Sequence, residues 1–107
     1  MLKWAKDLII GASVGKKSAD IMRRLDAGET VTMYFLITLT QGADQLEIIN
    51  TAYLAQKHVR ENLPMIVGIA GSKSEAKEMV EGLVGECYEA TGGADIKSYL
   101  KDKIESI

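Results

Sequence analysis

The sequence predicts a small α/β domain of the βαβαβα type, with a mostly parallel sheet of three strands, or four, flanked by helices. The main observation is a repeat: three times an apolar, β-rich stretch runs into a glycine turn and then into an amphipathic helix, at residues 8–16, 33–42 and 65–73. A second observation is composition. The 107 residues are 47% hydrophobic and 26% charged, which is typical of one globular domain that spans residues 1–107.

The composition also excludes several classes of protein. The net charge of −2 lacks the basic excess of nucleic-acid-binding modules, so no nucleic-acid partner is expected. No uncharged run of about 18 residues is present, which predicts no membrane span. The single cysteine, Cys87, cannot form an internal disulfide, and the first residues do not read as a secretory signal. We therefore expect a cytoplasmic protein.

The first unit is predicted as a strand over residues 8–10 followed by a helix over 16–27. One continuous helix over residues 3–26 is the alternative. Its interior glycines, Gly11 and Gly15, would each cost such a helix about 1 kcal/mol, which favours the strand, turn and helix. Gly28 stands where a left-handed residue ends a helix.

The second unit is predicted as a strand over residues 31–40 and a helix over 43–62 that ends before Pro64. Unbroken apolarity from Met33 to Ile37 indicates a central parallel strand, buried on both faces. The helix carries an apolar stripe that is wider than one sheet contact needs. The residues of this stripe are Ile48, Ile49, Ala52, Leu54, Ala55 and Val59.

The third unit is predicted as a strand over residues 65–70 and a helix over 73–91 that ends at Gly92-Gly93. Ser72-Lys-Ser-Glu75 fits a capping box at the start of this helix. Residues 95–100 fit either a short edge strand or a final helical turn, and residues 101–107 are expected to fray. The predicted buried stripe of the helix contains Ala76, Met79, Val80, Leu83, Val84 and Cys87.

Two features predict a homo-oligomer, most simply a homodimer. A sheet of three or four strands leaves open edges that invite pairing. The wide stripe over residues 43–62 would expose an apolar patch that monomers rarely carry. Association is therefore expected either edge to edge or helix to helix.

The glycine turns invite comparison with nucleotide-binding loops but do not match them. Between Gly11 and Gly15 stand three residues rather than four, and the hydroxyl follows a second lysine, so the segment is not a phosphate loop. The Gly68–Ser72 segment lacks the spacing of a dinucleotide fingerprint. A helix start with two lysines can still hold an anion.

The strongest candidate site is a ligand crevice at the edge of the sheet where the strand-to-helix loops meet. Its residues are rich in hydroxyls and poor in acid–base groups, which suits binding of a small anionic ligand better than catalysis. No catalytic residues, cofactor or metal site are predicted, because the only histidine, His58, and Cys87 lie on different helices. The predicted ligand-binding residues are Ser13, Lys16, Thr40, Ser72 and Lys73.

Three function classes remain open. The leading interpretation is a small homo-oligomeric interaction or regulatory module. The second is the binder of a small anionic ligand at the loop edge. The third is an enzyme, which would have to take its acid or base from Asp44, His58 or a group at an oligomer interface.

Overall fold

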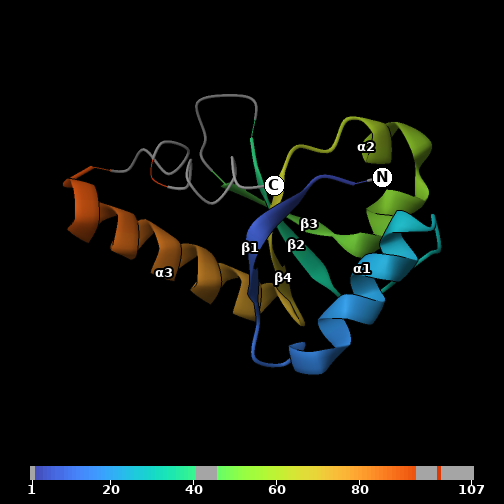
Figure 1. The fold of residues 1–107 in the computed structure, drawn as a ribbon, viewed down its shortest axis with the longest axis horizontal. Coiled ribbons are helices and arrows are strands. Elements are labelled where there is room, and N and C mark those ends of the chain that lie inside the picture. Colours follow the sequence, from blue (N-terminus) through green and yellow to red (C-terminus); the bar gives the residue numbers. More distant parts are fainter. Residues whose placement is uncertain (1, 41–45, 94–98, 100–107) are drawn as a thin grey trace.

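The computed structural model describes residues 2–40, 46–93 and 99, which form three layers (Figure 1). A four-stranded sheet stands in the middle, with the strand order β1 (Trp4–Ile10), β4 (Ile66–Ala70), β2 (Phe35–Leu39) and β3 (Leu46–Asn50). Helix α1 (Ser18–Asp26), preceded by the 3-10 turn η1 (Gly15–Lys17), covers one face together with η2 (Thr51–Ala55) and α2 (Lys57–Glu61). Helix α3 (Lys73–Thr91) covers the other face. The class is therefore mixed α/β.

The sheet is mixed rather than mostly parallel, so this part of the prediction is wrong. Strand β1 (Trp4–Ile10) runs parallel to β4 (Ile66–Ala70). Strand β2 (Phe35–Leu39) runs antiparallel to β4 on one side and to β3 (Leu46–Asn50) on the other. The cause is the segment after β2, which returns as a strand instead of crossing over as a helix, so β2 joins a hairpin.

The predicted helix over residues 43–62 is therefore wrong. Residues 46–50 are β3, and the short helices η2 and α2 follow. Leu46 and Ile48 pack on the α3 side of the sheet, whereas Ile49 packs on the α1 side, as alternating strand residues do. Asn50 ends the strand: its side chain caps η2 by accepting from the Ala52 N–H at 2.9 Å. The predicted turn at residues 41–42 and the start of that helix lie outside the described residues.

This change removes the surface that motivated the homodimer. Leu54 is a fully buried core residue, and Ile49 and Val59 pack against the same cluster. The apolar stripe assigned to one helix is thus divided: Ile48 packs on the α3 side of the sheet, Ile49, Leu54 and Val59 pack on the α1 side, and Ala52 and Ala55 are exposed. The argument for a dimer through residues 43–62 is wrong for this physical reason.

The local signals of the first and third units are confirmed. Residues 4–10 form a strand, which excludes one helix over 3–26, and Gly28, just beyond the end of α1 at Asp26, has a positive φ of 83°. Helix α3 spans the predicted residues and ends at Gly92, whose φ is 74° and whose N–H donates to Tyr88. Strand β4 also lies where it was predicted. The proposed structures of residues 95–98 and 100–107 fall outside the described part of the chain.

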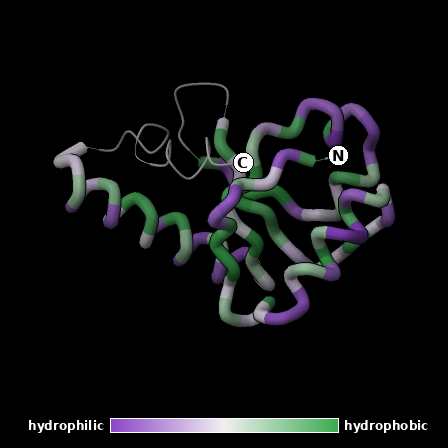
Figure 2. Tube along the Cα trace, in the orientation of Figure 1, coloured by the Kyte–Doolittle hydropathy of each residue, from purple (hydrophilic) through white to green (hydrophobic). Residues whose placement is uncertain are grey.

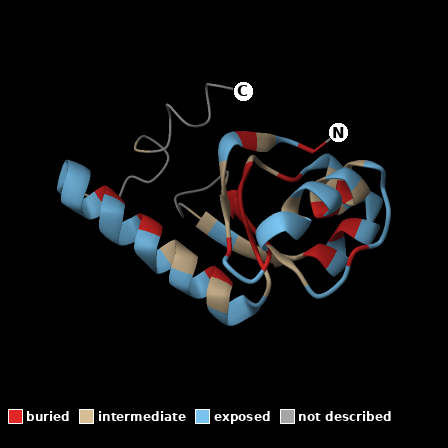
Figure 3. Cartoon of the chain, turned by 60° about the horizontal axis from the view of Figure 1, so that its bottom comes forward, coloured by how far each residue is buried: buried red, intermediate tan, exposed pale blue. Residues whose placement is uncertain are grey.

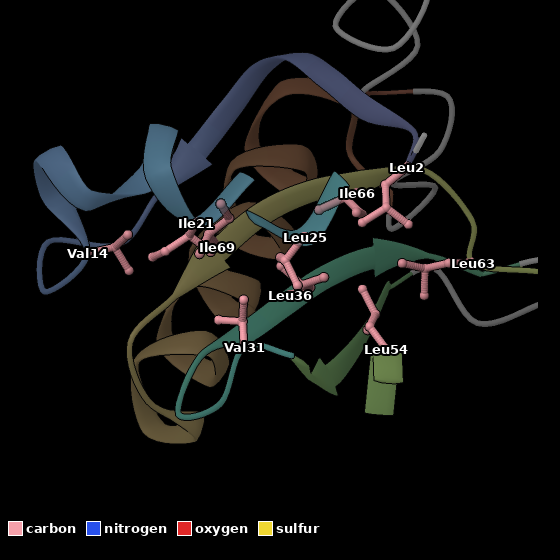
Figure 4. Close-up of a cluster of buried hydrophobic side chains, with 10 residues drawn as sticks. All are labelled: Leu2, Val14, Ile21, Leu25, Val31, Leu36, Leu54, Leu63, Ile66 and Ile69. Atoms are coloured by element: carbon pink, nitrogen blue, oxygen red, sulfur yellow. The ribbon is translucent and has the colours of Figure 1, made fainter. Parts of the chain in front are cut away.

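Two apolar clusters hold the layers together, one on each face of the sheet. The central strands β2 and β4 contribute to both, which is why Leu36–Leu39 and all of β4 are buried. Figure 2 shows this concentration of apolar residues in the strands, and Figure 3 shows the same strands as buried. The cluster on the α1 side, drawn in Figure 4, contains Leu2, Val14, Ile21, Leu25, Val31, Leu36, Leu54, Leu63, Ile66 and Ile69.

The approach to β2 departs from the predicted strand. Met33 has a positive φ of 72° and is 79% exposed, and the strand begins at Phe35 and not at residue 31. Such a backbone is strained for any residue but glycine.

Among the described residues, no helix is both long enough and apolar enough to cross a membrane.

Candidate functional site

Two of the strand-to-helix loops do meet at one edge of the sheet. Because β1 and β4 are parallel neighbours, the loops after Ile10 and Ala70 leave the sheet on the same side. The N–H of Gly11 donates to the Ile69 carbonyl at 2.8 Å and holds the first loop against the second. This arrangement places Ser13 against Gly71, the residue before Ser72.

Glu75 on the first turn of α3 joins these two loops. Its Oε1 accepts hydrogen bonds from the Gly71 N–H and the Ser13 hydroxyl, both at 2.7 Å. Its Oε2 accepts from the Ser13 N–H at 3.1 Å. The hydrogen bond from the Gly71 N–H, followed by those from the Ser13 hydroxyl and N–H, holds the pKa of Glu75 below its ordinary value.

The capping box is confirmed in one half and altered in the other. The Ser72 hydroxyl accepts from the Glu75 N–H at 3.0 Å, as predicted. The Glu75 carboxylate reaches past Ser72 to the Gly71 N–H and across to Ser13. Glycine is required at both turns for this contact, because a Cβ at Gly11 would overlap the Glu75 carboxylate and a Cβ at Gly71 would overlap the Ser13 hydroxyl.

The five predicted ligand-binding residues do not form one cluster. Ser13 and Ser72 lie together, but both hydroxyls bond to Glu75. Lys16 is exposed in η1. Thr40 lies at the opposite edge of the sheet, because β2 is antiparallel to β4 and the Leu39 N–H donates to the carbonyl of Met65, just before β4 begins.

Lys73, the fifth predicted residue, lines a pocket that the sequence did not reveal. The pocket has a volume of about 340 Å³, and its other lining residues are Phe35, Ile48, Asn50 and Tyr53. Phe35 comes from β2, within the predicted strand, whereas Ile48, Asn50 and Tyr53 come from β3 and η2, which the sequence analysis assigned to a helix. No signal within the sequence could have joined them to Lys73 without the correct strand pairing.

A second surface feature lies on the outer face of α3. Ala76, Leu83 and Cys87 of the predicted stripe are buried, but Val84 is 38% exposed, which corrects its place in that stripe. Tyr88, one turn further on, is 63% exposed. A shallow groove of about 530 Å³ follows this face and is lined by Val80, Glu81, Val84, Gly85, Tyr88 and Glu89.

The groups considered for catalysis are far from one another. Cys87 is fully buried on the α3 side of the sheet, where its sulfur lies 3.6 Å from the Gly93 carbonyl. His58 is exposed on α2, which belongs to the opposite layer. The two therefore do not form a nucleophile and base pair. Asp44 lies outside the described residues, and in the described part of the chain no three His, Cys, Asp or Glu side chains gather as metal ligands would.

Comparisons with protein-family models, curated proteins and solved structures found no match to this chain. Two surface features stand out in the described structure: the groove along α3 and the pocket beside Lys73.

Proposed function

We propose that this protein is an interaction module that binds an amphipathic helix of a partner protein in the groove along the outer face of α3. The partner helix would carry basic residues beside an apolar stripe. The observation that carries the proposal is the groove itself, in which an apolar floor is bordered by carboxylates.

The floor of the groove suits a helix with apolar anchors. Val80, Val84 and Tyr88 follow one another at intervals of four residues, so their side chains form a row along α3. Gly85 stands beside this row and adds no side chain to it, so a partner side chain can approach the backbone of α3 closely there. Exposed tyrosines and aliphatic side chains that gather at one place are typical of binding surfaces.

The charge around the groove specifies the partner. Glu81 and Glu89 are part of the lining. From Glu78 to Gly93 the chain contains four glutamates and no lysine or arginine. A helix with Lys or Arg next to its apolar anchors would meet this rim with complementary charge.

The same charge disfavours a second copy of the chain as the occupant. Two α3 helices packed face to face would bring the Glu81 and Glu89 rims against each other, and like charges at an interface are destabilising. Figure 1 shows α3 projecting beyond the strands, so that a partner helix could lie along it without displacing another described element. We therefore propose a different protein as partner, and the predicted homo-oligomer becomes the rival that the experiment tests.

The test uses a designed helical peptide as the probe, with leucines spaced by three and four residues and lysines beside them. Its binding to the ¹⁵N-labelled protein is followed by NMR, and we expect shifts in the groove residues. Because truncation of a central aromatic anchor costs about 1–2 kcal/mol or more, Tyr88→Ser should weaken binding about tenfold. Tyr53→Ser is the matched control, since Tyr53 is 56% exposed outside the groove.

Three further measurements could contradict the proposal. An otherwise identical peptide with glutamates in place of lysines should bind much more weakly, and equal binding would remove the argument from charge. Binding should weaken as salt is raised, because the rim is exposed to solvent. Sedimentation of the protein alone should give a monomer, whereas a dimer that Tyr88→Ser dissociates would make the groove a self-association surface.

A further inference from the structure

We propose that the pocket beside Lys73 is a separate ligand site, which takes a small molecule with one planar apolar ring and a carboxylate or phosphate group. The pocket lies at the first residue of α3, whereas the groove of the proposed function lies on its last three turns. The two proposals therefore rest on different residues and fail independently.

The strand pairing explains how the pocket forms. Phe35, the first residue of β2, pairs with Asn50 at the end of β3 and with Ala70 at the end of β4. Two helical segments begin directly beyond this row: η2 after Asn50 and α3 after Ser72. Residues from four elements thus meet at one corner of the sheet, and this corner is open to solvent.

The walls of the pocket suit a flat apolar group. Phe35 and Ile48 are half-buried and pack against the cluster on the α3 side, so they form a fixed base. Tyr53 is 56% exposed, which leaves much of its ring available to a ligand. At about 340 Å³ the pocket is at the small end of the range for ligand sites, which limits the occupant to about one ring with its substituent.

The polar groups of the pocket favour an anion. Lys73 contributes an ammonium group, and no carboxylate is among the lining residues. In the described part of the chain the ion pairs lie elsewhere, and Lys73 belongs to none of them. The Asn50 side-chain oxygen is already used by the Ala52 N–H, so the group that Asn50 can offer a ligand is its amide N–H₂. The Lys73 ammonium and the Asn50 amide donor are together complementary to a carboxylate or a phosphate.

The test compares four probes on the full chain by NMR: phenyl phosphate, benzoate, benzyl alcohol and inorganic phosphate. We expect the two aromatic anions to shift the signals of Phe35, Ile48, Tyr53 and Lys73, and the tighter of the two identifies the anionic group. Benzyl alcohol lacks the anionic group and inorganic phosphate lacks the ring, so each should bind at least tenfold more weakly than the aromatic anions.

Variants then assign the contacts. Lys73→Met should weaken the aromatic anions at least tenfold and leave benzyl alcohol unchanged, whereas Tyr53→Ala should weaken all three aromatic probes. Lys77→Met is the matched control, because Lys77 is exposed one turn further along α3 and does not line the pocket. Tyr88→Ser should also have no effect, which separates this site from the groove.

The proposal is overturned by any of three results. The first is that no probe shifts the pocket signals at about 20 mM, well above the millimolar affinities expected of such small ligands. The second is that inorganic phosphate binds as tightly as phenyl phosphate, which would make the ring irrelevant. The third is that Lys77→Met weakens the aromatic anions as much as Lys73→Met does.

Discussion

Replacing Glu75 with glutamine should destabilise the protein in a way that depends on pH. The carboxylate accepts three hydrogen bonds, from the Gly71 N–H and from the hydroxyl and N–H of Ser13. Glutamine keeps one carbonyl oxygen as an acceptor, but it presents an N–H₂ group where the second carboxylate oxygen accepts. Two donors then face each other, and the charge that strengthens the remaining bonds is lost.

The magnitude follows from the type of bond and its exposure. A hydrogen bond to a charged group contributes about 1.5–3 kcal/mol, and loss of a helix cap costs about 0.5–2 kcal/mol. Ser13 is exposed, so its bonds belong at the lower end of this range. We therefore expect Glu75→Gln to reduce the free energy of unfolding at pH 7 by about 1–2 kcal/mol. For a domain of this size the midpoint of thermal unfolding should fall by about 5 °C per kcal/mol.

The pH dependence has a definite sign. Since the hydrogen bonds hold the pKa of Glu75 below its ordinary value of 4.5 in the folded protein, its ionised form stabilises the fold above that pH. The contribution is lost as the pH falls through the lowered pKa of the folded state. Unfolding in urea at several pH values should therefore show a difference between wild type and Glu75→Gln that is constant near neutrality and shrinks below about pH 4.5.

A control and a double-mutant cycle make this prediction refutable. Glu78→Gln changes a nearby exposed carboxylate of α3 and should have little effect. Ser13→Ala combined with Glu75→Gln should give a coupling energy of at least about 0.5 kcal/mol, because the two side chains are in contact. If Glu75→Gln behaves like the control, or if its effect does not vary with pH, the contact between the two loops does not stabilise the fold.

Three further predictions concern other parts of the molecule. Met33→Gly should raise the free energy of unfolding by about 0.5–1 kcal/mol in a urea titration, because it removes the strain of a positive φ at an exposed side chain; a loss of stability would contradict this. Cys87 is fully buried, so its thiol should react slowly with a thiol reagent until denaturant is added, and rapid native-state reaction would refute its place in the core. Because Glu86 accepts a hydrogen bond from the Tyr99 hydroxyl and raises the pKa of Tyr99, Glu86→Gln should bring that pKa back toward its ordinary value in an NMR titration; an unchanged pKa would show that the bond is absent in solution.

Sequence reasoning succeeded where a structure is specified by neighbours in the chain. The cap at Ser72, the left-handed glycine at residue 92 and the apolar run of β4 are such local features, and all three are confirmed. The glycine turns after β1 and β4 predicted two loops at one edge of the sheet, and the structure joins these loops through the Gly11 N–H and Glu75. The bond between Glu75 and Ser13 joins residues 62 positions apart, so no local pattern could predict it.

The prediction for the segment after β2 failed because its apolar residues fit the period of a helix and also that of a strand. Leu46, Ile49 and Tyr53 fall at helical spacing, and Leu46 and Ile48 fall at the two-residue spacing of one face of a strand. The pairing of Ile48 and Ile49 with β2 decides the outcome, since it packs one of these half-buried residues against the apolar cluster on each face of the sheet. Only the tertiary contact distinguishes these solutions, so the propensity of the isolated segment could not.

The direction of β2 also decides the chemistry of the candidate site. A parallel β2 would have ended beside the loops after β1 and β4, and Thr40 would have joined Ser13 and Ser72 in a hydroxyl-rich crevice. The antiparallel strand starts there instead, so Phe35 and the end of β3 are placed at this edge and Thr40 lies at the other. The hydroxyls that remain are bonded to Glu75, while Lys73 faces a pocket with aromatic walls. The ligand that we propose for this edge, which carries both a ring and an anionic group rather than a bare anion, is thus a consequence of the direction of β2.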